Sequence, residues 1–202
     1  MIVAGDLRTV ARTCRAALEP FRDGDWDGPA ADLEWSRRAT LAHLLAALTF
    51  YSVNLATRSE EPRSGGQAND SMDIEHLLDA LEGRAEVLAV VCEAAPPEAR
   101  GGHEYGRSDP EGFVAMACDE LLIHSYDILS GFGARIAPPP DGVGGRILDR
   151  LFPWAPRDEA DEWSTLLWAN GRAPLGDRPR LEPDWVWLSV PLDRWNGEDP
   201  NR

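Results

Sequence analysis

The stretch DELLIHSYDI, residues 119–128, decides the interpretation of this chain, because it sets three ionisable side chains on one line among apolar ones. Glu120, His124 and Asp127 are spaced four and then three residues apart. On a helix that turns about 100° per residue, His124 lies about 40° from Glu120, and Asp127 lies about 20° to the other side. All three side chains are therefore predicted to project from one face of a largely apolar helix.

This face is predicted to point inward, because Phe113 and Ala117 precede it on the same line. A carboxylate that is buried without a partner is unfavourable, so Glu120 needs compensation for leaving water. An ion pair between Glu120 and His124 would supply it, and the spacing alone is typical of such a pair. A divalent metal ion is the alternative compensation.

A third candidate ligand for such an ion is His43, on the helix expected at residues 37–57. His43 lies off the leucine stripe of that helix, on a line with Ala39, Ala46, Ala47, Phe50 and Asn54. Small residues on this line would leave space between helices for an ion and a molecule bound to it. Two histidines and one carboxylate leave coordination positions open, as in catalytic zinc and non-haem iron sites. A core histidine that is hydrogen-bonded to a neighbour is the other interpretation of His43.

Apolar residues recur every three or four positions through the first 133 residues, which predicts an all-α, four-helix bundle. We expect its helices near residues 5–22, 37–57, 72–94 and 110–130. The expected N-terminal caps are Ser36, then Asp70 or Ser71, then Asp109 with Pro110 after it, and the last helix should end at Gly131 or Gly133. Polar loops rich in glycine and proline join the predicted helices.

Residues 134–202 are assigned to a C-terminal extension that packs on the bundle of residues 1–133. Helices are expected at 142–152 and 158–170, and WVWLSV at 185–190 is expected to be a strand of a small hairpin. The hairpin should turn near Gly176 and Asp177. The extension contains most of the tryptophans, which indicates packing against the bundle: Trp154, Trp163, Trp168, Trp185, Trp187 and Trp195.

The net charge of the chain limits the classes of partner that are expected to bind it. A formal net charge of −15 over 202 residues repels phosphate backbones and anionic lipid, so nucleic acid and membrane surfaces are not expected to bind. No window approaches 18 uninterrupted apolar residues, and the N-terminus is typical of an amphipathic helix. We expect a soluble, cytoplasmic protein that is a monomer or a homodimer.

The chain has no motif for protein-thiol, serine-nucleophile or nucleotide chemistry, since it contains no C-x-x-C, G-x-S-x-G or P-loop. Cys14, Cys92 and Cys118 are expected to be unpaired, buried and dispensable for catalysis. Two further histidines, His76 beside an apolar stripe and His103 in a glycine-rich loop, are expected to be solvated.

Two motifs together resemble the DinB-like superfamily, and more closely its branch typified by the amino-terminal domain of mycothiol-dependent maleylpyruvate isomerase. They are EWSRRATLAHL at 34–44 and DELLIHSYDILSGFG at 119–133. In that family a tryptophan followed by Ser or Thr precedes the histidine of the second helix by eight residues, as Trp35, Ser36 and His43 do here.

The second motif of the family is a Glu-x-x-x-His pair followed by Asp, which Glu120, His124 and Asp127 match. The segment LLWANGRAPL, residues 166–175, also resembles the carboxy-terminal region of the family, where Arg172 recurs. The resemblance thus covers most of the chain and implies a DinB-like bundle with a metal site.

The resemblance implies roles for particular residues. His43, Glu120 and His124 would bind a divalent ion, for which zinc is expected, and Asp127 would support these ligands or contact the substrate. Arg172 would anchor a substrate carboxylate. Asn54, on the line of His43, is a further candidate for substrate binding.

The implied reaction is thiol chemistry, in which a low-molecular-weight thiol such as mycothiol attacks an electrophilic small molecule. Addition to an activated alkene would make the protein an isomerase, and displacement at an electrophilic carbon would make it an S-transferase. Two other classes stay open: a metalloenzyme that uses metal-bound water or non-haem iron, and a non-catalytic small-molecule-binding or scaffold protein of the same fold.

Overall fold

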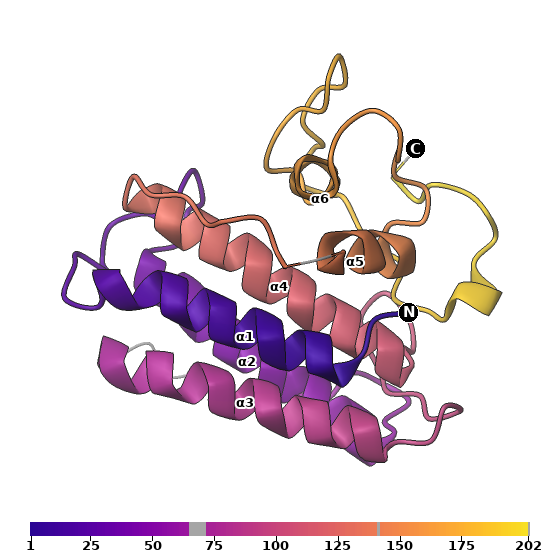
Figure 1. Ribbon diagram of the computed structural model, residues 1–202. Coiled ribbons are helices and arrows are strands. Elements are labelled where there is room, and N and C mark those ends of the chain that lie inside the picture. The colour runs from indigo at the N-terminus through magenta and orange to yellow at the C-terminus, as the bar shows by residue number, and fades with distance from the viewer. Residues whose placement is uncertain (65–71, 141, 202) are drawn as a thin grey trace.

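The computed structural model describes residues 1–64, 72–140 and 142–201, which contain six α-helices and no strand. The first four, α1 (Ala4–Leu18), α2 (Arg37–Thr57), α3 (Ile74–Ala94) and α4 (Pro110–Gly131), form a bundle (Figure 1). In it α3 and α4 each pack against both α1 and α2. The predicted all-α four-helix bundle is confirmed.

Two helices of the bundle begin at the predicted caps. The Ser36 hydroxyl accepts a hydrogen bond from the Ala39 amide at 3.1 Å, and the Asp109 carboxylate accepts one from the Gly112 amide at 2.7 Å. Pro110 follows Asp109 as the first residue of α4, where its missing N–H leaves no intrahelical bond unmade. Since α4 ends at Gly131, both ends of the helix that carries DELLIHSYDI are as predicted.

The other two helices differ at their ends from the prediction. α1 stops at Leu18, and a 3₁₀ turn, Glu19–Phe21, follows because Pro20 cannot donate a backbone hydrogen bond to continue the α-helix. α3 begins at Ile74, where Asp73 caps it by accepting from the His76 amide at 2.9 Å. The predicted caps Asp70 and Ser71 lie outside the described residues.

α2 is apolar around most of its circumference, and it carries the predicted ligand His43. By length and composition alone it could cross a membrane, but 61% of that apolar window is buried inside the protein. A helix that contacts neighbours on most of its sides has this composition without any membrane.

The C-terminal part adds α5 (Val143–Leu151), α6 (Glu162–Ala169) and a 3₁₀ turn at Leu192–Arg194. α5 packs on α4 and α6 packs on α5, so this part lies along one side of the bundle (Figure 1). Arg150 of α5 is almost fully buried and donates to the Asp109 carboxylate at 2.7 Å. It also donates to the carbonyl oxygens of Leu188 and Ser189, at 3.1 and 3.3 Å, which ties the last segment to the start of α4.

The prediction of a strand at residues 185–190 is wrong. Its backbone has no neighbouring strand among the described residues: the Leu188 amide donates to Leu151 at the end of α5, at 2.8 Å, and the Val186 amide donates to the Asn201 side chain, at 2.6 Å. The predicted turn exists as a single bridge between Leu175 and Arg178. Alternating aromatic residues therefore serve here to pack against the core in an irregular segment.

Tryptophans make much of the contact between the C-terminal part and the core. Trp168 is buried, and four others are partly buried against the core: Trp154, Trp163, Trp185 and Trp187. Only Trp195, also partly buried, lies further from it among the tryptophans of this part.

Candidate metal centre

Glu120 lies between the two histidines predicted as its co-ligands. Its Oε2 atom is 3.3 Å from Nε2 of His43 on α2 and 3.2 Å from Nε2 of His124, one turn along α4. One potential ligand atom from each of the three residues lies within 4.8 Å of the other two. The packing of α2 against α4 thus brings together residues that are far apart in the sequence.

These separations fit one small divalent ion. In a tetrahedral zinc site with bonds of about 2.1 Å, neighbouring ligand atoms are about 3.4 Å apart. The two measured separations, 3.3 and 3.2 Å, are close to that edge length. Two imidazole nitrogens and one carboxylate also form the donor set of open catalytic sites. The residues present therefore fit a zinc-like ion without rearrangement of the backbone.

A second layer of contacts orients His124. Its Nδ1 atom lies 3.0 Å from Oδ2 of Asp127, which leaves Nε2 directed toward Glu120. Asp127 is in turn held by Arg172, which donates from Nε at 3.0 Å and from Nη2 at 2.8 Å. A carboxylate on the outer nitrogen of a ligating histidine fixes the tautomer that leaves the inner nitrogen free for the metal.

Tyr51 orients the Glu120 carboxylate in a similar way. Its hydroxyl donates to Oε1 of Glu120 at 3.2 Å, so that Oε2 is the oxygen turned toward the histidines. On the outer side, the ring of Trp35, a residue that is 47% exposed, lies 4.9 Å from the ring of His43. The centre is thus supported from within the bundle and covered toward solvent by an aromatic ring.

The charge at the centre depends mainly on the protonation states of Glu120 and His124. Burial alone would raise the pKa of the Glu120 carboxyl, but hydrogen bonds from His124 and His43 hold that pKa well below its ordinary value. Burial would likewise lower the pKa of His124, but Asp127 and Glu120 raise it to about 9. His124 therefore carries a proton at neutral pH when no cation is bound, and a divalent ion would displace that proton.

Arg172 was predicted to anchor a substrate carboxylate, and the structure places it against a carboxylate of the protein. Besides its two bonds to Asp127, its Nη1 atom donates to the Asn170 carbonyl oxygen at 2.8 Å. Burial would raise the pKa of Asp127, but His124 and Arg172 keep it below its ordinary value. Arg172 is thus engaged in holding Asp127.

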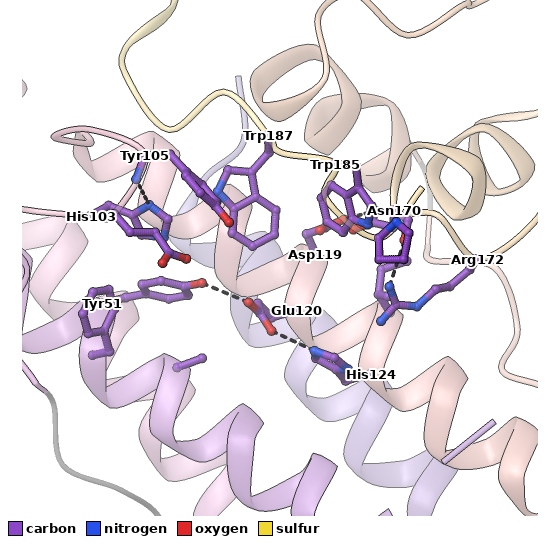
Figure 2. Close-up of a pocket in the computed structure, with 15 residues that line it drawn as sticks. Tyr51, His103, Tyr105, Asp119, Glu120, His124, Asn170, Arg172, Trp185 and Trp187 are labelled. Atoms are coloured by element: carbon purple, nitrogen blue, oxygen red, sulfur yellow. Dashed lines mark hydrogen bonds and ion pairs between the residues drawn. The ribbon is translucent and has the colours of Figure 1, made fainter. Parts of the chain in front are cut away.

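A cavity of about 360 Å³ lies beside Glu120 and His124 (Figure 2). Cavities of that size accept a small organic ligand. Residues from α2, from the loop before α4, from α4 and from the C-terminal part line it: Ala47, Phe50, Tyr51, His103, Glu104, Tyr105, Asp119, Glu120, Ile123, His124, Asn170, Arg172, Pro183, Trp185 and Trp187.

Asn54 does not reach this cavity. It is fully buried, and its side-chain oxygen accepts from the Ser59 hydroxyl at 2.6 Å and from the Arg63 amide at 2.8 Å. Its side-chain nitrogen donates to the carbonyl oxygens of Phe50 and Arg63. In this structure the contacts of Asn54 are structural and hold the loop after α2, and its role in substrate binding stays a prediction.

The prediction that His103 is solvated is wrong. Only 7% of it is exposed, it lines the cavity, and its Nδ1 accepts from the Tyr105 amide at 3.3 Å. Burial lowers its pKa to about 4, so it is neutral at physiological pH. No pattern in the sequence marked it, because it lies in an irregular loop. His76, in contrast, is exposed as predicted.

Sequence reasoning also missed Asp119 and Tyr51. Burial raises the pKa of Asp119 to about 8; its Oδ1 atom accepts from Asn170 at 2.9 Å, and Oδ2 has no hydrogen-bond partner among the described residues. Tyr51 could have been found, since it lies two turns beyond His43 and is buried at 3% exposure beside Glu120. For Asp119, its neighbour Glu120 was the more obvious candidate.

The three cysteines are unpaired and buried, as predicted. Burial raises the pKa of Cys14 and of Cys92 to about 12, and it raises that of Cys118 well above its ordinary value. None of the three lines the cavity described above.

The sequence pattern of the family described as mycothiol maleylpyruvate isomerase N-terminal domain matches residues 7–129. This range includes His43, Glu120, His124 and Asp127 and ends at the last turn of α4. No curated protein and no solved structure matches the chain. Because the match covers more than half of its residues, the chain belongs to this family, which is part of the DinB-like superfamily.

Proposed function

We propose that this member of the mycothiol maleylpyruvate isomerase N-terminal domain family is a metal-dependent enzyme that transfers a low-molecular-weight thiol to an electrophile or uses it to isomerise one. His43, Glu120 and His124 would hold the ion, which we propose to be zinc, and mycothiol or a similar thiol would be the co-substrate. One observation carries the proposal: these three residues converge from two helices, and two of them, Glu120 and His124, line a cavity of about 360 Å³.

When bound, a divalent ion supplies positive charge that favours the thiolate form of a thiol beside it. The protein supplies the rest. Asp127 and Arg172 keep His124 in its orientation, and Tyr51 keeps Oε2 of Glu120 directed at the histidines. The cavity gives the second substrate a place next to the centre.

A thiol from outside the protein is needed because the chain offers none of its own at the site. The cysteines are buried, away from the cavity lining, and burial raises their pKa values, so they are poor nucleophiles. A small thiol would enter the cavity beside Glu120 and His124. This part of the proposal rests on the family and on the cavity together.

Two outcomes of the reaction follow from the electrophile. With a carbon that bears a leaving group, a C–S bond forms while the bond to the leaving group breaks, and the leaving group departs with its electron pair. With an activated cis-alkene, a C–S bond forms, the former double bond rotates, and elimination returns the thiol with the trans-alkene. The first outcome is S-transfer and the second is isomerisation.

The test is thiol-dependent turnover of the metal-loaded protein, with monobromobimane as the electrophile and mycothiol, glutathione or no thiol as the co-substrate. We expect turnover above the uncatalysed rate with mycothiol, and its loss in His124→Ala. The matched control is His76→Ala, which removes an exposed histidine of α3 and should leave the rate unchanged.

Two results would contradict the proposal. Turnover of other substrates that needs the metal and no thiol would favour the class of enzymes that use metal-bound water or iron. Equal thiol-dependent rates in His124→Ala and in the unchanged protein would remove the metal centre from the reaction.

A further inference from the structure

The wall of the cavity beyond Glu120 and His124 is built from aromatic rings. The ring centroid of His103 lies 6.1 Å from that of Tyr51, 5.4 Å from that of Tyr105 and 6.0 Å from that of Trp187. Trp185 extends the row, at 5.8 Å from Trp187. Because each ring is within contact distance of the next, the five form one continuous surface, hereafter the aromatic wall.

The aromatic wall is assembled from three separate parts of the chain. Tyr51 belongs to α2, His103 and Tyr105 belong to the loop before α4, and Trp185 and Trp187 belong to the C-terminal part. Figure 2 shows the rings of His103, Tyr105 and Trp187 gathered across the cavity from Glu120 and His124.

Hydrogen bonds hold these parts in place before any ligand arrives. The Ser189 hydroxyl donates to the Gly106 carbonyl oxygen at 2.9 Å, which joins the segment of Trp187 to the loop of Tyr105. The Leu188 amide donates to Leu151, and buried Arg150 contacts the same segment. The wall is therefore a preformed surface, which costs little ordering of side chains on binding.

The charges around the cavity oppose an anionic substrate. Among the described residues that line it, Arg172 is the one guanidinium, and Asp127 already occupies two of its nitrogens. His103 is neutral, since burial lowers its pKa to about 4. Glu104 adds a carboxylate to the lining. His124 also lines the cavity, but Glu120 and Asp127 compensate its charge, so a substrate carboxylate would find no uncompensated cationic side chain there.

We propose that the aromatic wall is the subsite for the electrophilic substrate and that this substrate carries an aromatic ring and no carboxylate. The assignment of the ligand as the electrophile rests on the proposed thiol chemistry at the adjacent centre. Flat rings stack on or meet other rings edge-to-face at centroid separations of about 4.5–7 Å, and the wall offers such contacts on several neighbouring rings.

Binding of unreactive probes to the metal-loaded full chain tests the ring preference without turnover. Benzamide and cyclohexanecarboxamide share the amide group and differ in having a flat or a saturated ring. Isothermal titration should show benzamide binding about two- to tenfold more tightly, the range expected for one or two ring–ring contacts. Equal affinity of the two probes would overturn the proposal.

Substitutions locate the preference on the wall. Trp187→Leu should bring the affinity ratio of the two probes close to one, and so should Tyr105→Leu, which alters a 45% exposed loop residue and carries less risk for folding. Trp195→Leu is the control, because Trp195 is a partly buried tryptophan outside the cavity lining. The helical circular dichroism signal checks that each variant is folded. An unchanged ratio in folded Trp187→Leu and Tyr105→Leu would overturn the location.

Turnover then tests the charge preference with 4-(bromomethyl)benzamide and 4-(bromomethyl)benzoate, which share the benzylic carbon and the bromide leaving group; each rate is divided by the uncatalysed rate of the same compound. We expect kcat/KM for the benzoate to be at least about fivefold lower, since it would face Glu104 without a free cation. A preference for the benzoate would overturn the exclusion of carboxylates.

The two proposals fail in different ways. Thiol-dependent turnover without any ring preference would overturn the aromatic subsite and leave the thiol chemistry standing. A ring preference that depends on Trp187, in a protein that turns over no electrophile with any thiol, would support the subsite and overturn the thiol chemistry.

Discussion

Replacing Asp127 by Asn should weaken both the fold and the metal centre, because this one carboxylate contacts His124 and Arg172. Its oxygens lie 3.0 Å from His124 Nδ1 and 3.0 and 2.8 Å from Arg172 Nε and Nη2. The Asp127 side chain is 1% exposed and that of Arg172 is 11% exposed. The amide keeps the shape of the carboxylate and removes its charge.

The size of the effect follows from the burial of the pair. Removing one partner of a buried ion pair leaves the other charge uncompensated and costs about 3–5 kcal/mol. Loss of an outer partner of a ligating histidine lowers metal affinity by about 10- to 100-fold. We therefore expect the free energy of unfolding of Asp127→Asn to fall by about 3 kcal/mol, with metal affinity reduced within that range.

Urea unfolding of the metal-free protein measures the first effect, and competition with a chromogenic chelator measures the second. Glu159→Gln is the matched control, because Glu159 accepts two hydrogen bonds from Arg178 in an exposed pair. An exposed pair contributes little, so the control should change stability by less than about 1 kcal/mol. It should not change metal affinity.

A double-mutant cycle with Arg172→Met isolates the pair. The double variant should be more stable than the sum of the single changes predicts, by at least about 1 kcal/mol, since the two residues contact each other directly. Additive free energies, together with unaltered metal affinity in Asp127→Asn, would refute the reasoning.

Three further predictions concern protons and thiols. Metal affinity should rise about tenfold per pH unit and level off near pH 9, because the ion displaces the proton of His124. Burial lowers the pKa of His124, but Asp127 and Glu120 raise it to about 9. A flat pH profile of metal affinity in the chelator competition would contradict this prediction. Burial lowers the pKa of His103 from 6.5 to about 4, so the unfolded chain binds this proton first as pH falls, and folding loses on the order of 3 kcal/mol between these values. Urea titrations should show a smaller loss over this window in His103→Gln. The alanine variant of Cys14, Cys92 and Cys118 should keep thiol-dependent turnover of monobromobimane, and its loss in a folded protein would point to a protein thiol.

Local signals were enough to predict the helices of the bundle. Ser36 and the pair Asp109 and Pro110 marked two helix starts, because capping depends only on residues within one turn. Local signals could not show whether residues 185–190 form a strand. A strand is stable only with a neighbour, and no short-range pattern shows that this segment meets α5 and the loop before α4 instead.

The candidate site likewise combines residues that local spacing predicts with residues that only the fold brings together. Glu120 and His124 share a helix face by spacing alone, whereas the approach of His43 came from the family pattern and the packing of α2 on α4. Asn54 lies on the face of His43, but a shared face does not tell which end of the helix meets a cavity. At its end, Asn54 meets the loop that contains Ser59.

The site residues that could not be predicted from the sequence lie in irregular segments. His103 and Trp187 become neighbours, at 6.0 Å between ring centroids, only through the fold of a loop and of the C-terminal part. Arg172 was recognised as a site residue, but its partner Asp127 follows from three-dimensional contacts.

The central claim is that His43, Glu120 and His124 hold one divalent ion, and elemental analysis tests it most directly. The unchanged protein and His124→Ala are purified side by side without chelator or nickel resin, and the metal content per chain is measured by inductively coupled plasma mass spectrometry. We predict close to one divalent ion per chain in the unchanged protein and a large loss of it in the folded variant. A metal-free unchanged protein, or equal metal content in the two, would contradict the claim.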